Sequence, residues 1–263
     1  MTDKTPPTKP AGALHAGLDV LEILAAHPEG LGVTAIALEL GADKGNIHRV
    51  LRSLSERGYA EQDEQTRMFT ASAELFRLAG SLLRNQALTT VARPFMRTLS
   101  VELGAPVHLA RRLRRGGVYV GREGTSTTGV SVETEIGVQP PLHASATGKA
   151  LFILTTPEEL AELLPEELPA FTETTIRTRT ALWDEIAHAR RVGFTIDREE
   201  LNRRVVCVAA PVLDYSGAVV GSIGISSLIS DPDEIDLDAR GRRVADVAAL
   251  ITERLGGKPL LSP

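Results

Sequence analysis

The strongest constraint on the fold is the spacing of four small or apolar residues near the N-terminus. Ala37 and Gly41 are followed by Ile47 and Val50. In a helix-turn-helix the first helix carries a small residue where the second helix crosses it, and the turn carries a glycine that tolerates a positive φ. The second helix buries apolar residues on one side. Because these residues meet all three requirements, two helices and a tight turn are predicted.

The flanking segments extend this pair into a small winged domain over residues 13–72. A first amphipathic helix is predicted over residues 13–27, and Thr34 is predicted to cap the helix that ends before Gly41. Residues 59–62 and 67–70 are predicted to be two short strands around a polar turn, which form a wing. The apolar stripe that predicts the first helix is Leu14, Leu18, Leu21 and Ala25.

The exposed side of the predicted second helix is basic although the whole chain has a net charge of -5. The segment from Asp43 to Arg57 contains four positively charged residues and two negatively charged ones. DNA affinity depends on local phosphate contacts, so the acidic average does not exclude DNA. A bare three-helix bundle with a solvated basic face is the alternative, but the joint spacing and the wing favour a helix in the major groove. The predicted DNA contacts are Thr34, Lys44, Gly45, Asn46, His48, Arg49, Arg52 and Arg67.

Three further segments are predicted around the winged domain. Residues 1–12 are rich in Pro, Thr and Lys and are predicted to be a disordered tail. Residues 73–90 are predicted to be a linker helix, and residues 91–263 a second domain. There short β-rich runs joined by turn signals, at residues 107–110, 118–121, 205–212 and 219–226, alternate with helical runs. This alternation predicts an α+β domain whose antiparallel sheet is flanked by helices.

Several classes of protein are excluded by what the sequence lacks. No apolar run approaches the roughly 20 residues that cross a bilayer, and the N-terminus has no secretory signal, so the cytoplasm is expected. The single cysteine, Cys207, cannot form an internal disulfide or anchor a multi-cysteine metal site. The phosphate-loop, Gly-x-Ser-x-Gly and His-Glu-x-x-His motifs are absent. An enzyme, a metal site and a cofactor are therefore not expected.

Three runs of sequence resemble the IclR family of bacterial transcription regulators. The first extends from Gly30 to Tyr59 and includes Lys44, His48 and Arg49; Gly45 and Asn46 stand where the family usually has Ser and Thr. The second, residues 142–150, reads LHASATGKA, and the third comprises GFTID and VVCVAAPV at residues 193–197 and 205–212. The resemblance covers about residues 12–255.

The resemblance implies a GAF-like sensor domain whose pocket binds a small organic acid. Backbone amides at the predicted helix start after His143 suit an anion, because the first turn of a helix has unpaired N–H groups. From the residues alone, Cys207 is equally well explained as an ordinary core residue. Asp197 can be a turn residue, and Ser226 can pair only with the backbone. The positions carried over as effector contacts are Ser145, Ala146, Thr147, Asp197, Cys207 and Ser226.

Two departures from the family pattern bear on the effector. Gly224 replaces a serine that the family often has two residues before Ser226, and Arg204 replaces a glycine. The lost hydroxyl and bulk at Gly224 favour an effector larger or less polar than a two-carbon acid, such as an aromatic acid. Arg204 is interpreted as a solvated arginine, with a salt bridge to the effector as the alternative.

The partners implied by the resemblance are a near-palindromic double-stranded DNA operator, a small-molecule effector and further copies of the chain. A dimer of dimers is expected, with DNA-binding domains that pair through their N-terminal helices and sensor domains that pair separately. The sequence leaves repression and activation open, since the sign depends on the position of the operator. The alternative function is a sensor module that binds protein, rather than DNA, through its N-terminal domain.

Overall fold

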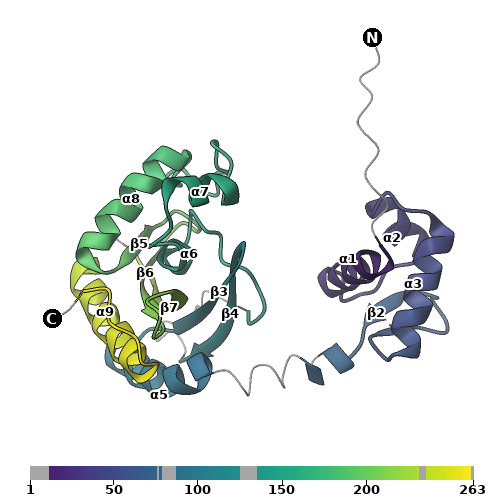
Figure 1. Cartoon of the computed structure of the whole chain (residues 1–263), viewed down its shortest axis with the longest axis horizontal. Helices are drawn as coiled ribbons and strands as arrows, with labels where there is room; N and C mark the ends of the chain where they lie inside the picture. The colour runs from purple at the N-terminus through teal and green to yellow at the C-terminus, as the bar shows by residue number, and fades with distance from the viewer. Residues whose placement is uncertain (1–11, 76, 79–86, 125–134, 231–234, 262–263) are drawn as a thin grey trace, which may run out of the picture. The chain divides into compact units, whose positions relative to one another are not determined.

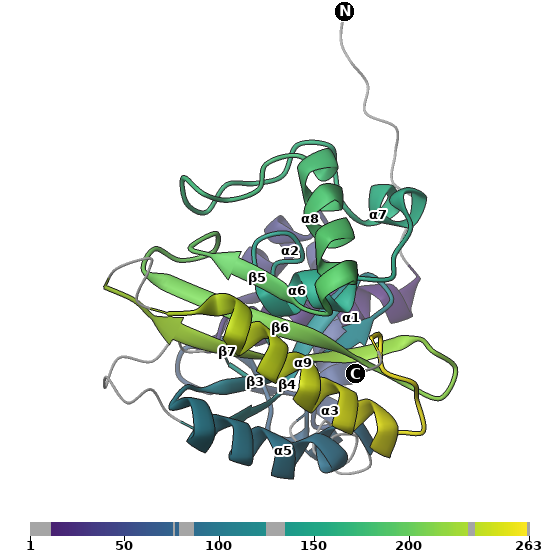
Figure 2. The ribbon, with the colours of Figure 1, turned by 90° about the vertical axis from the view of Figure 1, so that its left-hand side faces the viewer.

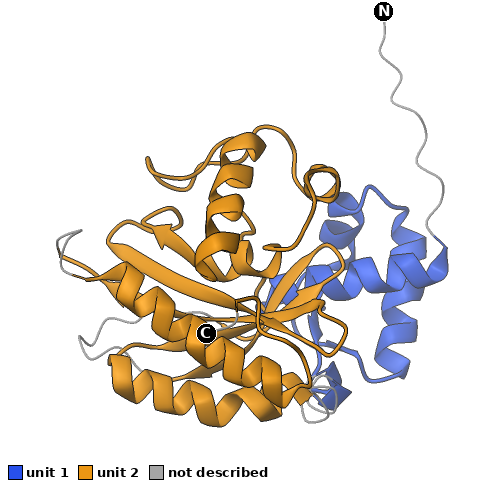
Figure 3. Cartoon of the chain, turned by 60° about the vertical axis from the view of Figure 1, so that its left-hand side comes forward, with its two compact units in different colours: residues 1–83 blue, residues 84–263 orange. Residues whose placement is uncertain are grey.

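The chain divides into two compact units, residues 1–83 and 84–263, which are coloured separately in Figure 3. The structure, a computed structural model, describes residues 12–75, 77–78, 87–124, 135–230 and 235–261. The predicted tail, residues 1–11 with Gly12 at its end, lies almost wholly outside this range. The predicted linker helix is described only in part: 74–75 and 77–78 are helical, 76 and 79–86 lie outside the described residues, and 87–90 belong to the next helix.

Unit 1 is a three-helix domain followed by a hairpin (Figure 1). Its elements are α1 (Ala13–Ala26), α2 (Val33–Glu39), α3 (Lys44–Glu56), β1 (Ala60–Gln62) and β2 (Phe69–Ala71). The two strands pair antiparallel, and Phe69 also bridges to Leu31. One apolar core joins all five elements, which confirms the predicted helix-turn-helix with a wing.

The turn between α2 and α3 has the chemistry that the spacing predicted. Gly41 has a φ of +59°, a left-handed conformation that favours glycine. Asp43 caps α3, since its side chain accepts the amide hydrogen of Asn46 at 3.0 Å. Ala37 on α2 and Ile47 and Leu51 on α3 are buried, so the helices cross closely.

Two details of unit 1 correct the sequence-based expectations. Thr34 does not cap α2: Gly32 holds that position, and Thr34 is the second residue of the helix. The stripe of Leu14 and Leu18 does not face the core either, since these side chains are 75% and 52% exposed. The buried face of α1 is Ala16, Val20, Ile23 and Leu24. Both sets recur at helical spacing, so α1 has two apolar faces, and only one packs within its own unit.

Unit 2 is built on a five-stranded antiparallel sheet with the strand order β4-β3-β7-β6-β5. Its strands are β3 (Val107–Leu113), β4 (Gly116–Glu123), β5 (Thr195–Arg198), β6 (Val205–Leu213) and β7 (Val219–Leu228). Its helices are α5 (Ala87–Leu103), α6 (Ala146–Leu151), α7 (Pro157–Leu163), α8 (Arg179–Val192) and α9 (Leu237–Arg254). Helices α5 and α9 cover one face of the sheet, and α6 lies against the other (Figure 2). The predicted α+β sheet domain is confirmed.

Two elements of unit 2 were not predicted from the sequence. Strand β5 contains the charged pair Asp197 and Arg198, and only its pairing with β6 makes it a strand. Helix α7 has seven residues, too few for a periodic signal, although Thr156 and Glu159 form a complete capping box at its start. Across the described part of the chain, no helix combines the length and hydropathy needed to span a membrane.

Candidate functional site: the polar face of α3 and a buried cavity

One side of α3 is a polar surface and the other is core. Lys44, Gly45, His48 and Arg49 are exposed and Asn46 is half-buried, whereas Ile47 and Leu51 are completely buried. This division follows the helical period, because residues three or four apart share a face. The structure thus places five of the predicted DNA contacts together in the first two turns of α3, and a sixth, Arg52, further along the same helix. Thr34 is exposed in the first turn of α2.

Arg52 and Arg67 are held by local contacts. Arg52 donates to Glu56 one turn later on α3, at 2.9 Å, an exposed pair that phosphate can displace at little cost. Arg67 lies in the hairpin loop with a φ of +60°. Its amide donates to the carbonyl of Asp63, and its own carbonyl accepts from Gln62. The wing therefore presents Arg67 in a defined loop conformation.

The six predicted effector contacts lie around one cavity in unit 2. Strand register places Asp197 opposite Cys207 and Cys207 opposite Ser226, so three neighbouring strands contribute one row of polar side chains. The start of α6, Ser145 to Thr147, lies over this row. All six line a cavity of about 40 Å³.

The start of α6 is fixed by the Ser145 side chain. Its hydroxyl donates to the carbonyl of Pro141 at 2.7 Å and accepts the amide hydrogen of Gly148 at 3.0 Å. In the first turn of any helix the next amides have no acceptor within the helix. Here those are the amides of Ala146 and Thr147, both at buried residues lining the cavity. The arrangement can bind a carboxylate.

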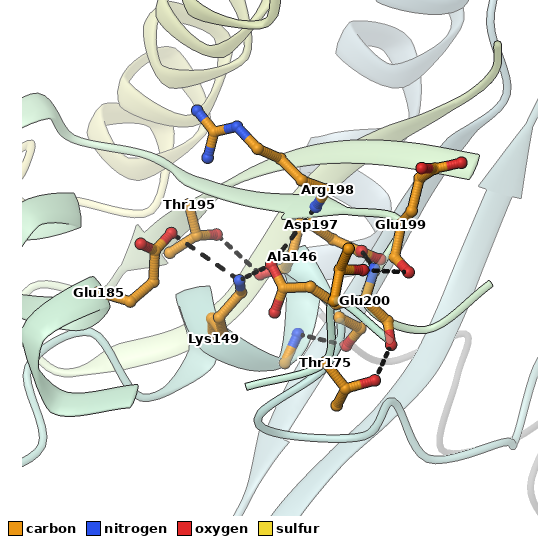
Figure 4. Close-up of polar contacts among 12 residues, drawn as sticks. Ala146, Lys149, Thr175, Glu185, Thr195, Asp197, Arg198, Glu199 and Glu200 are labelled. Atoms are coloured by element: carbon orange, nitrogen blue, oxygen red, sulfur yellow. Dashed lines mark hydrogen bonds and ion pairs between the residues drawn. The ribbon is translucent and has the colours of Figure 1, made fainter. Parts of the chain in front are cut away.

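Asp197 is joined to a buried ion pair (Figure 4). Its carboxylate accepts the amide hydrogen of Glu200 at 2.7 Å, and the Glu200 side chain accepts from the Lys149 ammonium at 2.7 Å. Lys149 is fully buried, with Glu185 as a second carboxylate at 3.8 Å. Burial raises the pKa of Asp197 to about 7, against the hydrogen bond from Glu200, which lowers it. The site therefore holds a carboxyl group that is protonated in part at neutral pH.

The raised pKa of Asp197 makes the stability of unit 2 depend on pH. The folded state holds this proton more tightly than the unfolded chain, so its stabilisation is complete below the ordinary pKa of 3.8 and is lost as pH rises through 7. Between pH 5 and 8 we expect the free energy of unfolding to fall by about 2–3 kcal/mol from this group. In Asp197→Asn that loss is absent, so between pH 5 and pH 8 the melting temperature of the variant should rise by several degrees relative to that of wild type. A constant difference between the two proteins at both pH values would contradict this assignment.

Sequence reasoning missed three polar residues of the cavity, His108 on β3, Tyr119 on β4 and Asn202 between β5 and β6. The Tyr119 hydroxyl lies 2.7 Å from that of Thr147, and burial raises the pKa of Tyr119 to about 12. His108 is buried edge-on against the Tyr119 ring. The available signal was a histidine within the apolar run from Val107 to Ala110. His143, in contrast, donates from Nε2 to the Pro169 carbonyl at 2.8 Å and does not line the cavity.

The structure contradicts the argument that Gly224 enlarges the pocket. A Cβ atom at Gly224 would lie 2.8 Å from Cβ of Ala209 and 3.1 Å from Cγ2 of Thr147. Neighbouring side chains already occupy the space that a serine would need, so the replacement adds no volume. A cavity of about 150 Å³ is known to hold a benzene ring. This cavity of about 40 Å³ would have to open to admit one.

Cys207 is part of the cavity wall. Its thiol donates to the Ser226 hydroxyl at 3.2 Å, and burial raises the pKa of the Cys207 thiol, which disfavours a nucleophilic thiolate.

Arg204 is exposed and does not line the cavity; its guanidinium donates to the Ile229 carbonyl. Within the described ranges no cluster of three His, Cys, Asp or Glu side chains suits a metal ion.

Two family models match the chain. The IclR helix-turn-helix domain matches residues 13–64, and the bacterial transcriptional regulator IclR C-terminal matches residues 80–252. The HTH-type transcriptional repressor AllR of Escherichia coli K12 is 31% identical over 251 residues, which cover 95% of this chain and 92% of AllR.

Solved structures share the fold. An IclR transcriptional regulator from Alicyclobacillus acidocaldarius superposes with a TM-score of 0.81 at 22% identity, over 94% of this chain and 100% of that one. An IclR homologue from Microbacterium hydrocarbonoxydans, in complex with 4-hydroxybenzoate, superposes with a TM-score of 0.77 at 21% identity, over 93% and 99% of the two chains.

Proposed function

Because this chain belongs to the IclR family of bacterial transcriptional regulators, we propose that it is a repressor controlled by a small organic acid. It is a DNA-binding transcription regulator and not an enzyme. In the proposal α3 reads the major groove of a near-palindromic operator, and the cavity of unit 2 holds the acid. The choice of repression over activation rests on the similarity to AllR, whose name states that it is a repressor.

The observation that carries DNA recognition is the two-sided character of α3. Its buried side fixes the helix in the domain, and its exposed side offers Lys44, His48 and Arg49 as donors to base edges and phosphates. Gly45 leaves room for close approach of a phosphate, and Asn46 has the groups that pair with adenine. Thr34, Arg52 and Arg67 extend the proposed contacts to the flanking backbone.

The proposal for effector control rests on the chemistry of the cavity. First-turn amides of Ala146 and Thr147 suit a carboxylate, and Asp197, Cys207 and Ser226 offer hydrogen bonds to its neighbouring atoms. The 4-hydroxybenzoate bound by the Microbacterium homologue is an acid of this kind, with a hydroxyl group in addition. Control requires that the acid bind one arrangement of the two units more tightly than the other.

The exposed face of α1 supports pairing of two DNA-binding units. Leu14 and Leu18 border a groove of about 440 Å³ between α1 and α3, which a second α1 can cover. In Leu18→Glu we expect this contact to fail, because pairing would bury a carboxylate in an apolar interface. Sedimentation of the full chain should then show half the wild-type mass, since only the contact between sensor units remains. Leu38→Glu, at a leucine on α2 that is 84% exposed, is the matched control. Equal masses for wild type and Leu18→Glu would refute α1 pairing.

The direct test of the function is fluorescence anisotropy on duplex DNA. The probes are the DNA upstream of the protein's own gene and duplexes selected from a random pool, with an unrelated duplex as control. We expect tight, sequence-preferring binding whose logarithm falls steeply with the logarithm of salt concentration. The alternative, a sensor module that binds protein through unit 1, predicts that no duplex is preferred.

A further inference from the structure

His108 stands out among the buried polar residues of unit 2. Its side chain is 2% exposed, it lines the cavity, and both ring nitrogens lack a hydrogen-bond partner among the described residues. A buried polar group without a partner is destabilising, so such groups in folded proteins are nearly always satisfied by protein, water or ligand. No described residue supplies a donor or an acceptor to the His108 ring, so we look to the contents of the cavity.

The position of His108 in the sheet separates it from the predicted acid-binding groups. His108 on β3 lies opposite Gly224 on β7, two residues along from Ser226. Asp197 lies on β5, at the other edge of the sheet, three strand spacings of about 4.8 Å from β3. The polar lining of the cavity therefore runs across the sheet from Asp197 through Cys207 and Ser226 to His108, so that Asp197 and His108 lie at its two ends, and α6 packs against these strands.

The protonation state of His108 selects the chemistry that it can recognise. Burial, together with the positive charge of Arg122 on the neighbouring strand, lowers the pKa of His108 to about 4, so the ring is neutral at pH 7. A neutral imidazole offers one donor and one acceptor. A hydroxyl group can pair with either ring nitrogen, as donor to one or as acceptor from the other, whereas a carboxylate can pair only with the N–H and would place its charge beside an uncharged ring.

We propose that His108 is the specificity-determining residue of the sensor cavity, where it selects a hydroxy acid by hydrogen bonding to the effector's hydroxyl group. The inference rests on the proposed function, because it takes the cavity to be the effector site. It assigns the effector a class: a monocarboxylic acid with its carboxylate at the amides of Ala146 and Thr147 and a hydroxyl group at His108. The size of the cavity favours two- or three-carbon members, and an aromatic member requires it to open.

The test compares acids that differ only by the hydroxyl group. Isothermal titration calorimetry of the full chain is carried out with glycolate and acetate, lactate and propionate, and 4-hydroxybenzoate and benzoate. For at least one pair we expect wild type to prefer the hydroxy acid by about tenfold, the usual effect of one buried hydrogen bond. In His108→Phe, which keeps an aromatic ring at the site, the preference should disappear while the plain acid binds as before.

A second readout does not depend on a variant that folds. In the wild type, the ring nitrogen NMR signals of His108 should move when the preferred hydroxy acid is added and stay in place with its plain partner. The exposed His188 is the internal control. His108→Gln, which retains a donor and an acceptor, should keep part of the preference.

Each outcome decides between the two proposals. One outcome is that the acids bind, Asp197→Ala weakens their binding, and His108→Phe keeps the preference for the hydroxy acid. In that case water satisfies His108 and the inference is wrong, while the proposed function stands. If His108→Phe weakens both members of a pair equally, the carboxylate lies at His108 and the stated orientation is wrong. If no acid of the panel binds wild type, the small-acid effector itself is refuted together with the inference.

Discussion

Replacing Arg49 with alanine is expected to abolish sequence-specific DNA binding while effector binding remains intact. Arg49 is exposed on α3 and lies outside the core that Ile47 and Leu51 help to form, so its removal leaves those two residues in place. A side chain that contacts a base edge contributes about 1–3 kcal/mol. A dimer loses two such contacts, so operator affinity should fall on the order of 100-fold or more.

The matched control is Arg115→Ala, which removes an exposed arginine and the same charge from the hairpin between β3 and β4. Both variants are titrated on the selected operator and on an unrelated duplex, and their oligomeric states are compared because Arg49 also lines the groove beside α1. Lys44→Ala should weaken binding to every duplex and reduce the salt slope by about one, as expected for a phosphate contact. Unchanged operator affinity in Arg49→Ala, with wild-type mass, would refute α3 as the recognition helix.

Replacing Lys149 with methionine is expected to destabilise unit 2 by about 3–5 kcal/mol, the usual effect of leaving a buried charge unpaired. The Glu200 carboxylate is only 8% exposed and would lose the ammonium that lies 2.7 Å away. Its second oxygen already lacks a partner among the described residues. Because Glu200 also donates its amide hydrogen to Asp197, the loss should loosen the effector site as well.

Chemical denaturation measures the effect. Lys258→Met, at an exposed lysine, is the control and should change the free energy of unfolding by less than about 0.5 kcal/mol. The double variant Lys149→Met/Glu200→Leu removes both charges and should recover much of the stability, since an apolar pair can replace a buried ion pair. A single variant as stable as Lys258→Met would show that the pair does not stabilise the fold.

The helix-turn-helix could be predicted from the sequence because its determinants are local. Gly41 is required by the left-handed backbone of the turn, and Ala37 and Ile47 lie close to it in the sequence, on the two helices that the turn joins. The face of α1 that packs could not be predicted, since two apolar stripes have the same helical period. Only contact with α3 and the hairpin decides that Val20 is buried and Leu18 is exposed.

In unit 2 the sequence identified the strands β3, β4, β6 and β7 and, through the resemblance, six residues that line one cavity. It could not identify His108, because alternation along a strand says which residues share a face and not which strands are neighbours. His108 reaches the cavity only because β3 pairs with β7, more than 100 residues later in the chain. The Lys149–Glu200 pair likewise joins α6 to the segment after β5.

The sequence by itself thus determined the local units of this protein: the helix-turn-helix, the basic face of α3, the helix start after His143 and the apolar strands. These depend on residues within a few positions of one another, where backbone geometry is enforced directly. The tertiary structure alone decided which strands pair, how small the cavity is and which buried polar groups find partners. Those properties depend on contacts between residues distant in the chain, and no local pattern encodes them.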